Sequence, residues 1–221
     1  MLALLVTAHP DDECMFFGPT LQSLRCQAVL VQLLCLSTGN AEGRGAERSV
    51  ELVRACEALQ VDRRDINILD DLKFQPQDGQ SCVWSPDEVA AAVDRQLQQH
   101  EYDLVLTFDD YGVSGHSNHC ATFAGIRQLA KAARLAHTSK PHFLMLESVS
   151  LLRKFSGPLE LLIPRSACHD IAGDFVTLTA SSSAAIRSAM ALHRTQWLWY
   201  RRLFILFSRY TYMNTFKPML V

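Results

Sequence analysis

Short apolar runs alternate along the chain with longer segments in which apolar residues recur at helical spacing. The runs are nearly continuous in apolar residues, as is typical of strands covered on both faces of a sheet. They predict five buried strands, at residues 2–7, 29–36, 65–69, 104–108 and 143–146. Because the first run begins at Leu2, with no lead-in to the sheet, we expect a further segment upstream in the full protein.

The segments between the runs have the pattern of amphipathic helices. In one of them, Pro86 suits the first turn of a helix and follows a capping residue, Ser85. Helices are expected at 46–59, 86–100, 117–135 and 183–209. Alternation of strands and helices predicts an α/β fold with a mostly parallel sheet wrapped by helices.

The predicted organisation is a single domain. Residues 1–182 form its α/β part, and residues 183–221 form a C-terminal helix and a basic, aromatic tail that belong to the same domain. The chain has 221 residues, of which 48% are hydrophobic and 20% are charged. This composition is typical of a globular domain and excludes a disordered chain, a collagen-like repeat and a heptad rod.

The charge is distributed unevenly, although the net charge is only −2. Residues 175–221 contain six basic residues and no Asp or Glu, whereas the rest of the chain contains 15 basic and 23 acidic residues. A basic tail on an acidic body indicates an anionic partner or surface. No nucleic-acid motif accompanies the charge, so we expect no nucleic-acid partner.

The seven cysteines form no C-x-x-C pair, and several lie in apolar runs. Buried, reduced thiols on the cytosolic side of a membrane are the simplest interpretation. No apolar run reaches the ~18 residues typical of a membrane span, and the N-terminus lacks the regions of a signal peptide.

A polar motif, Ala8-His9-Pro10-Asp11-Asp12-Glu13, follows the first predicted strand directly. The carboxyl ends of parallel strands are where an open α/β sheet builds its site. An imidazole and two carboxylates in a turn made rigid by proline suit a divalent metal ion. The alternative is an ordinary helix start, because Asp at the cap and Glu in the first turn favour a helix N-terminus.

A second motif, Gly115-His116-Ser117-Asn118-His119, follows the fourth predicted strand. Three ligands, His9, Asp12 and His119, would leave a fourth position for water, as in catalytic zinc sites. Asp11 and His116 would then be the acid/base pair beside that water. The alternative for the two histidines is a polar surface, but both motifs follow buried strands, which favours a metal site.

The two motifs together resemble those of the zinc-dependent LmbE-like deacetylases, the PIG-L family. The resemblance extends to His193-Arg194-Thr195-Gln196 and to Trp199-Tyr200-Arg201-Arg202-Leu203. It implies a Rossmann-like α/β fold. It also implies Zn²⁺ as cofactor with His9, Asp12 and His119 as ligands, Asp11 as general base, and His116 as the residue that stabilises the tetrahedral intermediate or protonates the leaving amine.

The C-terminal segment points, within this family, to members that remove the acetyl group from N-acetylglucosaminyl-phosphatidylinositol, the second step of GPI-anchor biosynthesis. The resemblance then implies a glycolipid substrate, a membrane surface and the cytosolic face of the endoplasmic reticulum. Two alternatives stay open. One is a soluble deacetylase of another N-acetylglucosamine conjugate, and the other is a catalytically silent membrane-associated module.

Further residues have weaker signals. Arg48 and Asn40, after the second predicted strand, are candidate substrate-binding residues, the alternative for Arg48 being a solvated helix charge. Asp109 and Asp110 could orient a ligand histidine or could simply form a turn. His193 matches a family segment but has no assigned role. The aromatic residues of the tail either contact anionic lipid or close the core with the arginines facing water.

Overall fold

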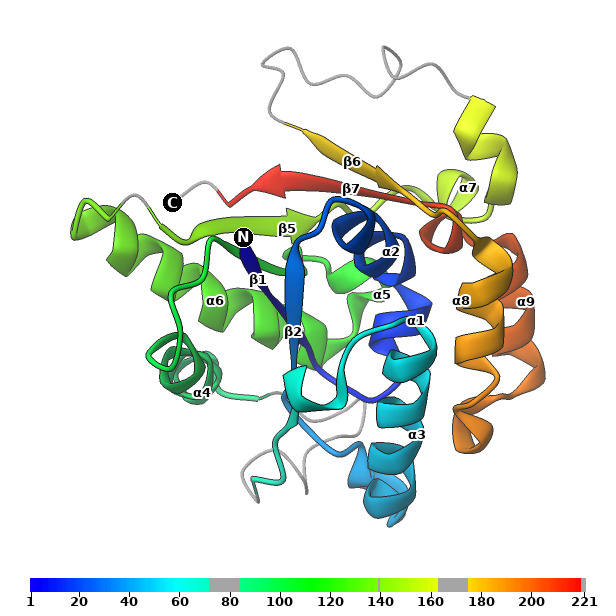
Figure 1. The fold of residues 1–221 in the computed structure, drawn as a ribbon, viewed down its shortest axis with the longest axis horizontal. Helices are drawn as coiled ribbons and strands as arrows, with labels where there is room; N and C mark the ends of the chain where they lie inside the picture. The colour runs from blue at the N-terminus through cyan, green and yellow to red at the C-terminus, as the bar shows by residue number, and fades with distance from the viewer. Residues whose placement is uncertain (72–83, 139, 163–174, 220–221) are drawn as a thin grey trace.

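Within residues 1–71, 84–138, 140–162 and 175–219, which the computed structural model describes, seven strands form one mixed sheet (Figure 1). The spatial order is β3-β2-β1-β4-β5-β7-β6. The strands are β1 (Leu2–Thr7), β2 (Leu30–Cys35), β3 (Ile66–Ile68), β4 (Leu104–Phe108), β5 (His142–Leu146), β6 (Val176–Thr179) and β7 (Met213–Pro218).

The first five strands are parallel, which confirms the predicted sheet with ends shifted by at most one residue. Ala3 of β1 lies opposite Val31 of β2 on one side and Leu104 of β4 on the other. The chain order therefore reverses between β1 and β4, which is the topological switch point of the sheet. Ligands of open α/β sheets bind in the crevice at the carboxyl ends of such strands.

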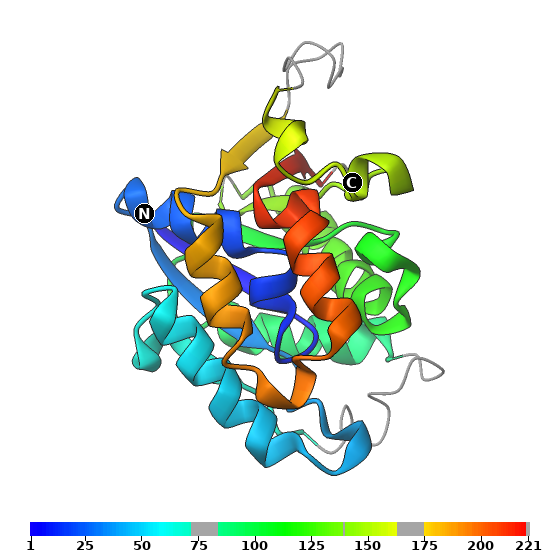
Figure 2. The ribbon, with the colours of Figure 1, turned by 90° about the vertical axis from the view of Figure 1, so that its right-hand side faces the viewer.

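Helices cover both faces of this sheet (Figures 1 and 2). On one face, α4 and α6 pack against each other and α6 lies on β1 and β4. On the other face, α2 lies on β2 and β7, while α8 packs on α1 and α3. The α-helices are α1 (Asp12–Met15), α2 (Gly18–Cys26), α3 (Gly45–Ala58), α4 (Pro86–Leu97), α5 (Gly112–Gly115), α6 (Ser117–Leu135), α7 (Leu151–Lys154), α8 (Ser183–Met190) and α9 (Trp199–Phe207).

Five short 3₁₀ turns connect these elements within the described residues. They are η1 (Asn40–Glu42), η2 (Arg63–Asp65), η4 (Gly157–Leu162), η6 (Arg194–Gln196) and η7 (Arg209–Thr211). In the described part of the chain, no helix combines the length and the apolar character that crossing a membrane requires. The five described cysteines are free thiols, and three of them are buried.

The prediction of one helix over 183–209 is wrong, because the segment divides into α8, η6 and α9. The helix is interrupted where polar side chains turn into the core. His193 lies 2.6 Å from a Glu13 oxygen, and Thr195 donates from its amide and hydroxyl to the carboxylate of Glu51. The amide of Thr195 therefore donates to Glu51 and not to the backbone carbonyl that a continuous helix would offer.

Strands β6 and β7 were not predicted, and they bring the tail into the sheet. β7 is antiparallel to both β5 and β6. Asn214 of β7 accepts hydrogen bonds from the amide and hydroxyl of Thr20 and donates one to the carbonyl of Phe16. The last segment of the chain is thereby fastened to the elements that follow β1.

Candidate active site

The carboxylate of Asp12 is fixed by the turn that follows β1. Its Oδ2 accepts hydrogen bonds from the amides of Ala8 at 3.0 Å and His9 at 2.8 Å. Its Oδ1 lies 3.2 Å from Nε2 of His119. Burial acts to raise the pKa of Asp12, but the adjacent His119 and His9 and these hydrogen bonds hold it below its usual range.

His119 is oriented by the backbone of α5. Its Nδ1 donates to the carbonyl of Gly112 at 3.0 Å, so its Nε2 faces Asp12. The approach is possible because Gly112 has no side chain. Its φ is +59°, and a Cβ there would lie 2.5 Å from the Cβ of His119.

The histidines of the two motifs form one cluster. One ring nitrogen from each of His9, His116 and His119 lies within 4.8 Å of the other two. Nε2 of His9 lies 3.1 Å from the side-chain nitrogen Nδ2 of Asn118. Burial, the largest effect, lowers the pKa of His9 well below its usual value, so its imidazole is held neutral, as a metal ligand must be.

The donor set fits a divalent metal of borderline softness such as zinc. The proton of His119 is on Nδ1, so a neutral ring directs the lone pair of Nε2 at the Asp12 carboxylate, 3.2 Å away. Two electron-rich atoms this close and buried need a cation with them, either a proton or a metal ion. Nitrogen and carboxylate ligands at an α/β crevice are what zinc accepts in catalytic sites.

Asp11 lies beside this cluster in an unusual conformation. Its φ of 116° belongs to the left-handed region, and its amide donates to Oε2 of Glu13 at 3.0 Å. Its carboxylate contacts two guanidinium groups: Nη2 of Arg48 lies 3.5 Å from Oδ1, and Nη1 of Arg201 donates to Oδ2. Burial raises the pKa of Asp11 despite both arginines.

Arg201 is a site residue that the sequence analysis missed. It was predicted only as part of the basic tail, yet α9 carries it into the site, where it also contacts the side-chain oxygen of Gln196. Its position in the segment 199–203, which resembles the family, was the one available signal. Its ion pair with Asp11 spans 190 positions of sequence, which no local pattern reveals.

The two predicted substrate-binding residues differ in position. Arg48 lines the pocket and donates to the carbonyls of Gly39 at 2.9 Å and Pro10 at 2.7 Å. Asn40 is exposed and does not line the pocket, and its side-chain oxygen accepts from the amide of Gly45 at the start of α3. Its role in substrate binding stays a prediction.

His116 is the N-cap of α6. Its Nδ1 accepts the amide of Asn118 at 3.3 Å, so Nε2 carries the proton of the neutral ring. The half-buried ring stacks against His119 with centroids 4.8 Å apart. Burial, the largest effect, lowers the pKa of His116.

The loop before His116 has a strained backbone, and residues from other parts of the chain hold it in place. Val113 has a φ of 65°, which is costly for a β-branched residue. Its amide donates to Oγ of Ser148 at 2.9 Å, and its carbonyl accepts from the buried Lys154. Asp109 accepts from the amide of Gly112 at 3.0 Å and from Ser148, so it shapes the turn that supports His119 and does not touch the ring itself.

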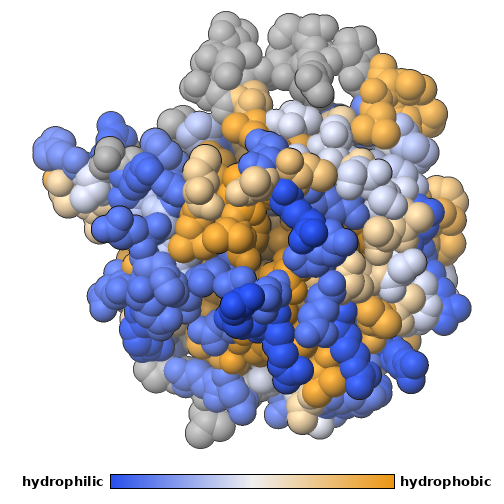
Figure 3. All heavy atoms as spheres, in the orientation of Figure 1, coloured by the Kyte–Doolittle hydropathy of each residue, from blue (hydrophilic) through white to orange (hydrophobic). Residues whose placement is uncertain are grey.

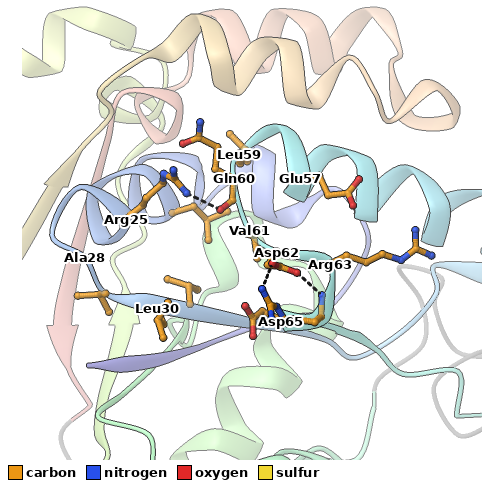
Figure 4. A pocket seen from close by; sticks show the side chains of 14 residues that line it. Arg25, Ala28, Leu30, Glu57, Leu59, Gln60, Val61, Asp62, Arg63 and Asp65 are labelled. Carbon is orange, nitrogen blue, oxygen red and sulfur yellow. Dashed lines mark hydrogen bonds and ion pairs between the residues drawn. The ribbon is translucent and has the colours of Figure 1, made fainter.

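All five motif residues line one pocket of about 330 Å³. The pocket opens at the switch point of the sheet, and Arg48 and Arg201 complete its polar wall. The structure thus brings together His9, Asp11, Asp12, His116 and His119, although their roles stay predictions. A larger hollow of about 1040 Å³ lies at the opposite end of β2, between the ends of α2 and α3, and contains none of these residues (Figure 4).

Comparisons with known proteins agree on one family. The family model described as PIG-L, GlcNAc-PI de-N-acetylase, matches residues 4–130. The N-acetylglucosaminyl-phosphatidylinositol de-N-acetylase of Bos taurus is 39% identical over 216 residues, which cover 96% of this chain and 81% of that protein. A probable enzyme of the same name from Schizosaccharomyces pombe is 36% identical and is covered to 85% of its length, with 97% of this chain matched.

Solved structures share the fold at lower identity. The N,N'-diacetylchitobiose deacetylase of Pyrococcus horikoshii has a TM-score of 0.63 at 17% identity, over 98% of this chain and 83% of that chain. The zinc-inhibited form of a teicoplanin deacetylase has a TM-score of 0.63 at 15% identity, over 99% and 97%. A 4-carboxy-2-hydroxymuconate hydratase has a TM-score of 0.61 at 14% identity, over 100% and 96%. The fold alone therefore does not determine the reaction.

Proposed function

Because this chain belongs to the PIG-L family of GlcNAc-PI de-N-acetylases, we propose that it removes the acetyl group from N-acetylglucosaminyl-phosphatidylinositol with the help of a bound zinc ion. One observation carries the proposal. Five motif side chains, from two segments far apart in the sequence, converge on a single buried pocket at the switch point of the sheet. This convergence has no evident structural purpose, because the fold needs no buried cluster of three imidazoles and two carboxylates.

His9, Asp12 and His119 would hold the metal, which when bound makes water more acidic and polarises the acetamide carbonyl. The rest of the reaction belongs to residues of the chain. Asp11 accepts a proton from the attacking water as the water oxygen bonds to the acetamide carbon. Cleavage of the C–N bond then needs a proton on the nitrogen, and the products are acetate and a primary amine.

His116 acts on the tetrahedral intermediate. Its Nδ1 is occupied by the amide of Asn118, so Nε2 is the atom that donates toward the pocket. From there it stabilises the charge that develops on the acetamide oxygen. Asp11, once protonated, can return its proton to the departing nitrogen, whereas His116 can supply a proton only from its imidazolium form.

The two arginines favour a substrate with a phosphate group. Arg48 and Arg201 both line the pocket, and guanidinium groups bind phosphate oxygens in pairs of hydrogen bonds. N-acetylglucosaminyl-phosphatidylinositol carries a phosphodiester, which would compete with Asp11 for these arginines. Substrate binding would thereby release the carboxylate of Asp11 to act as a base.

We also propose, from the resemblance alone, that the reaction takes place at the cytosolic face of the endoplasmic reticulum. The free thiols of the described cysteines fit a reducing compartment. Immunolocalisation combined with protease protection of intact microsomes tests this placement.

The test is acetate release from N-acetylglucosaminyl-phosphatidylinositol in mixed micelles. We expect release by the wild-type chain to stop on chelation and to return with zinc. Asp11→Asn should lower the rate by about 10²–10⁴-fold, as loss of a general base does, while keeping its metal. Metal content is measured on the same samples.

Asp110→Asn is the matched control, because Asp110 is an exposed carboxylate near the same edge of the sheet that does not line the pocket. It should release acetate at the wild-type rate. Near wild-type release by Asp11→Asn would refute the role of the base. Release from a water-soluble N-acetylglucosamine conjugate, with none from the glycolipid, would show the soluble alternative to be correct.

A further inference from the structure

Large apolar side chains gather on the surface beside the pocket. They come from two segments distant in the sequence, α7 with η4 and α9 with the residue before it. We call this surface the docking patch. Its exposed members are Leu151, Leu152, Phe155, Leu159, Leu161, Leu162, Leu198, Trp199, Tyr200, Leu203, Leu206 and Phe207.

The two segments of the docking patch pack against each other. The rings of Phe155 and Phe204 meet edge to face with centroids 6.0 Å apart, and α9 contacts η4 (Figure 2). Figure 3 shows the apolar surface over α7 and η4 at the upper right of the molecule. The docking patch is therefore continuous and does not consist of scattered single residues.

A surface helix of a globular protein normally turns a polar face to water, and α9 does not. Of its nine residues, only Arg201 and Arg202 are charged, and Trp199 is 73% exposed. Leu152 of α7 is 89% exposed. Contiguous exposed apolar surface of this kind marks an interaction site.

The charges of the docking patch are positive. Its one acidic residue, Glu160, is buried and paired with Arg153 and Arg209. Arg202 is exposed and lies 5.3 Å from the ring centre of Trp197. Aromatic and leucine side chains with arginine, and with no exposed carboxylate in the described residues 151–162 and 198–207, complement a lipid surface, where acyl chains lie beneath phosphate groups.

We infer that the docking patch seats this chain on a phospholipid bilayer, with the pocket mouth at the lipid surface. The geometry connects the two, because Arg201 belongs to α9 and also lines the pocket. Lys154 of α7 likewise reaches the loop that carries His116, through the carbonyl of Val113. This inference rests on the proposed function. In this placement the sugar enters the pocket while the acyl chains of the substrate stay in the bilayer.

Flotation with vesicles of phosphatidylcholine and phosphatidylinositol tests the inference. The test variant is Leu152→Asp with Trp199→Asp. Both side chains are exposed, so the substitutions should not impair folding. The matched control is Leu135→Asp, at the carboxyl end of α6 on the opposite side of the molecule and 72% exposed (Figure 1). We expect the partition coefficient of the double variant to fall at least tenfold and that of the control to match the wild type.

Two acetate-release assays separate this inference from the proposed function. The first uses the glycolipid embedded in vesicles, and the second uses its water-soluble N-acetylglucosaminyl-inositol phosphate headgroup. The rate of acetate release by the double variant should fall at least tenfold with the vesicles and should equal the wild-type rate with the headgroup. If the wild type releases acetate from neither substrate, the proposed function fails, and flotation still tests the docking patch.

Two results would overturn the inference. One is flotation of the double variant equal to that of the wild type. The other is a wild-type chain that does not float and sediments as a dimer that Leu152→Asp with Trp199→Asp dissociates. The docking patch would then be an interface between copies of the chain.

Discussion

Replacement of His193 by alanine tests whether a buried ion pair supports the turn that carries the motif of residues 8–13. His193 and Glu13 are both fully buried, and Nε2 of His193 lies 2.6 Å from Oε1 of Glu13. The other oxygen of Glu13 accepts the amide of Asp11 at 3.0 Å. His193, in the tail, therefore holds the residue that keeps Asp11 in its left-handed conformation.

The expected loss of stability follows from the charge left behind. Removing one partner of a buried ion pair costs about 3–5 kcal/mol, because the remaining charge is uncompensated. In a Glu13→Gln background the remaining group is a neutral amide, and His193→Ala should cost only about 1–3 kcal/mol for a lost hydrogen bond and a small cavity. The difference, about 2 kcal/mol, is the coupling between the two residues.

The pair also makes stability depend on pH. Burial acts to lower the pKa of His193, but the Glu13 carboxylate beside it raises the pKa overall. The stabilisation that results is fully present below the unfolded pKa of about 6.5 and is lost as the pH rises through the folded pKa. Wild-type stability should decline over this interval, and in Glu13→Gln the decline should be smaller, because the pKa of His119 is also raised and its contribution remains.

Urea unfolding at pH 6, followed by tryptophan fluorescence, measures all four proteins of the cycle. With a slope of about 2–3 kcal/mol per molar urea, His193→Ala should lower the midpoint by about 1–2 M. A loss below about 1 kcal/mol would refute the reasoning. So would equal losses in the wild-type and Glu13→Gln backgrounds, since these would show that the pair is not coupled.

Two further substitutions test the support of the histidines. Gly112→Ala should destabilise the protein by about 1–3 kcal/mol and reduce the amount of zinc bound. The new Cβ would collide with His119, and residue 112 has a φ of +59°. An unchanged Tm and metal content would contradict this. Lys154→Met should lower kcat for the soluble headgroup at least tenfold with little change in Tm. The substitution removes the hydrogen bond to the carbonyl of the strained Val113 but does not open a cavity. An unchanged kcat would show that the lysine does not position His116.

The central parallel strands and the motifs that follow them could be predicted from the sequence. Both β1 and β4 are buried on two faces, so their apolar runs are continuous and their ends are sharp. Since parallel strands end at the same edge, the residues after them had to meet. The site motifs were predictable because they are local and follow clear strands.

The structure of the tail was not predictable, because it depends on contacts between residues far apart in the sequence. No Gly or Pro interrupts residues 183–209, so nothing local ends the expected helix. The break at His193 depends on Glu13, 180 positions away. In β7 the buried polar residues Asn214 and Thr215 remove the apolar alternation by which a strand is recognised.

The two halves of the chain therefore contribute different things to the site. The family model matches residues 4–130, which contain all five motif residues. Two of the side chains that hold those residues in place come from beyond that range: Lys154 supports the loop of His116, and Arg201 contacts Asp11. Because a hydratase shares this fold, the fold alone does not determine the chemistry. The C-terminal elements help to set the geometry of those motifs, and they also carry the docking patch. The proposed attachment to a membrane and the positions of Asp11 and His116 therefore depend on the same helices, α7 and α9.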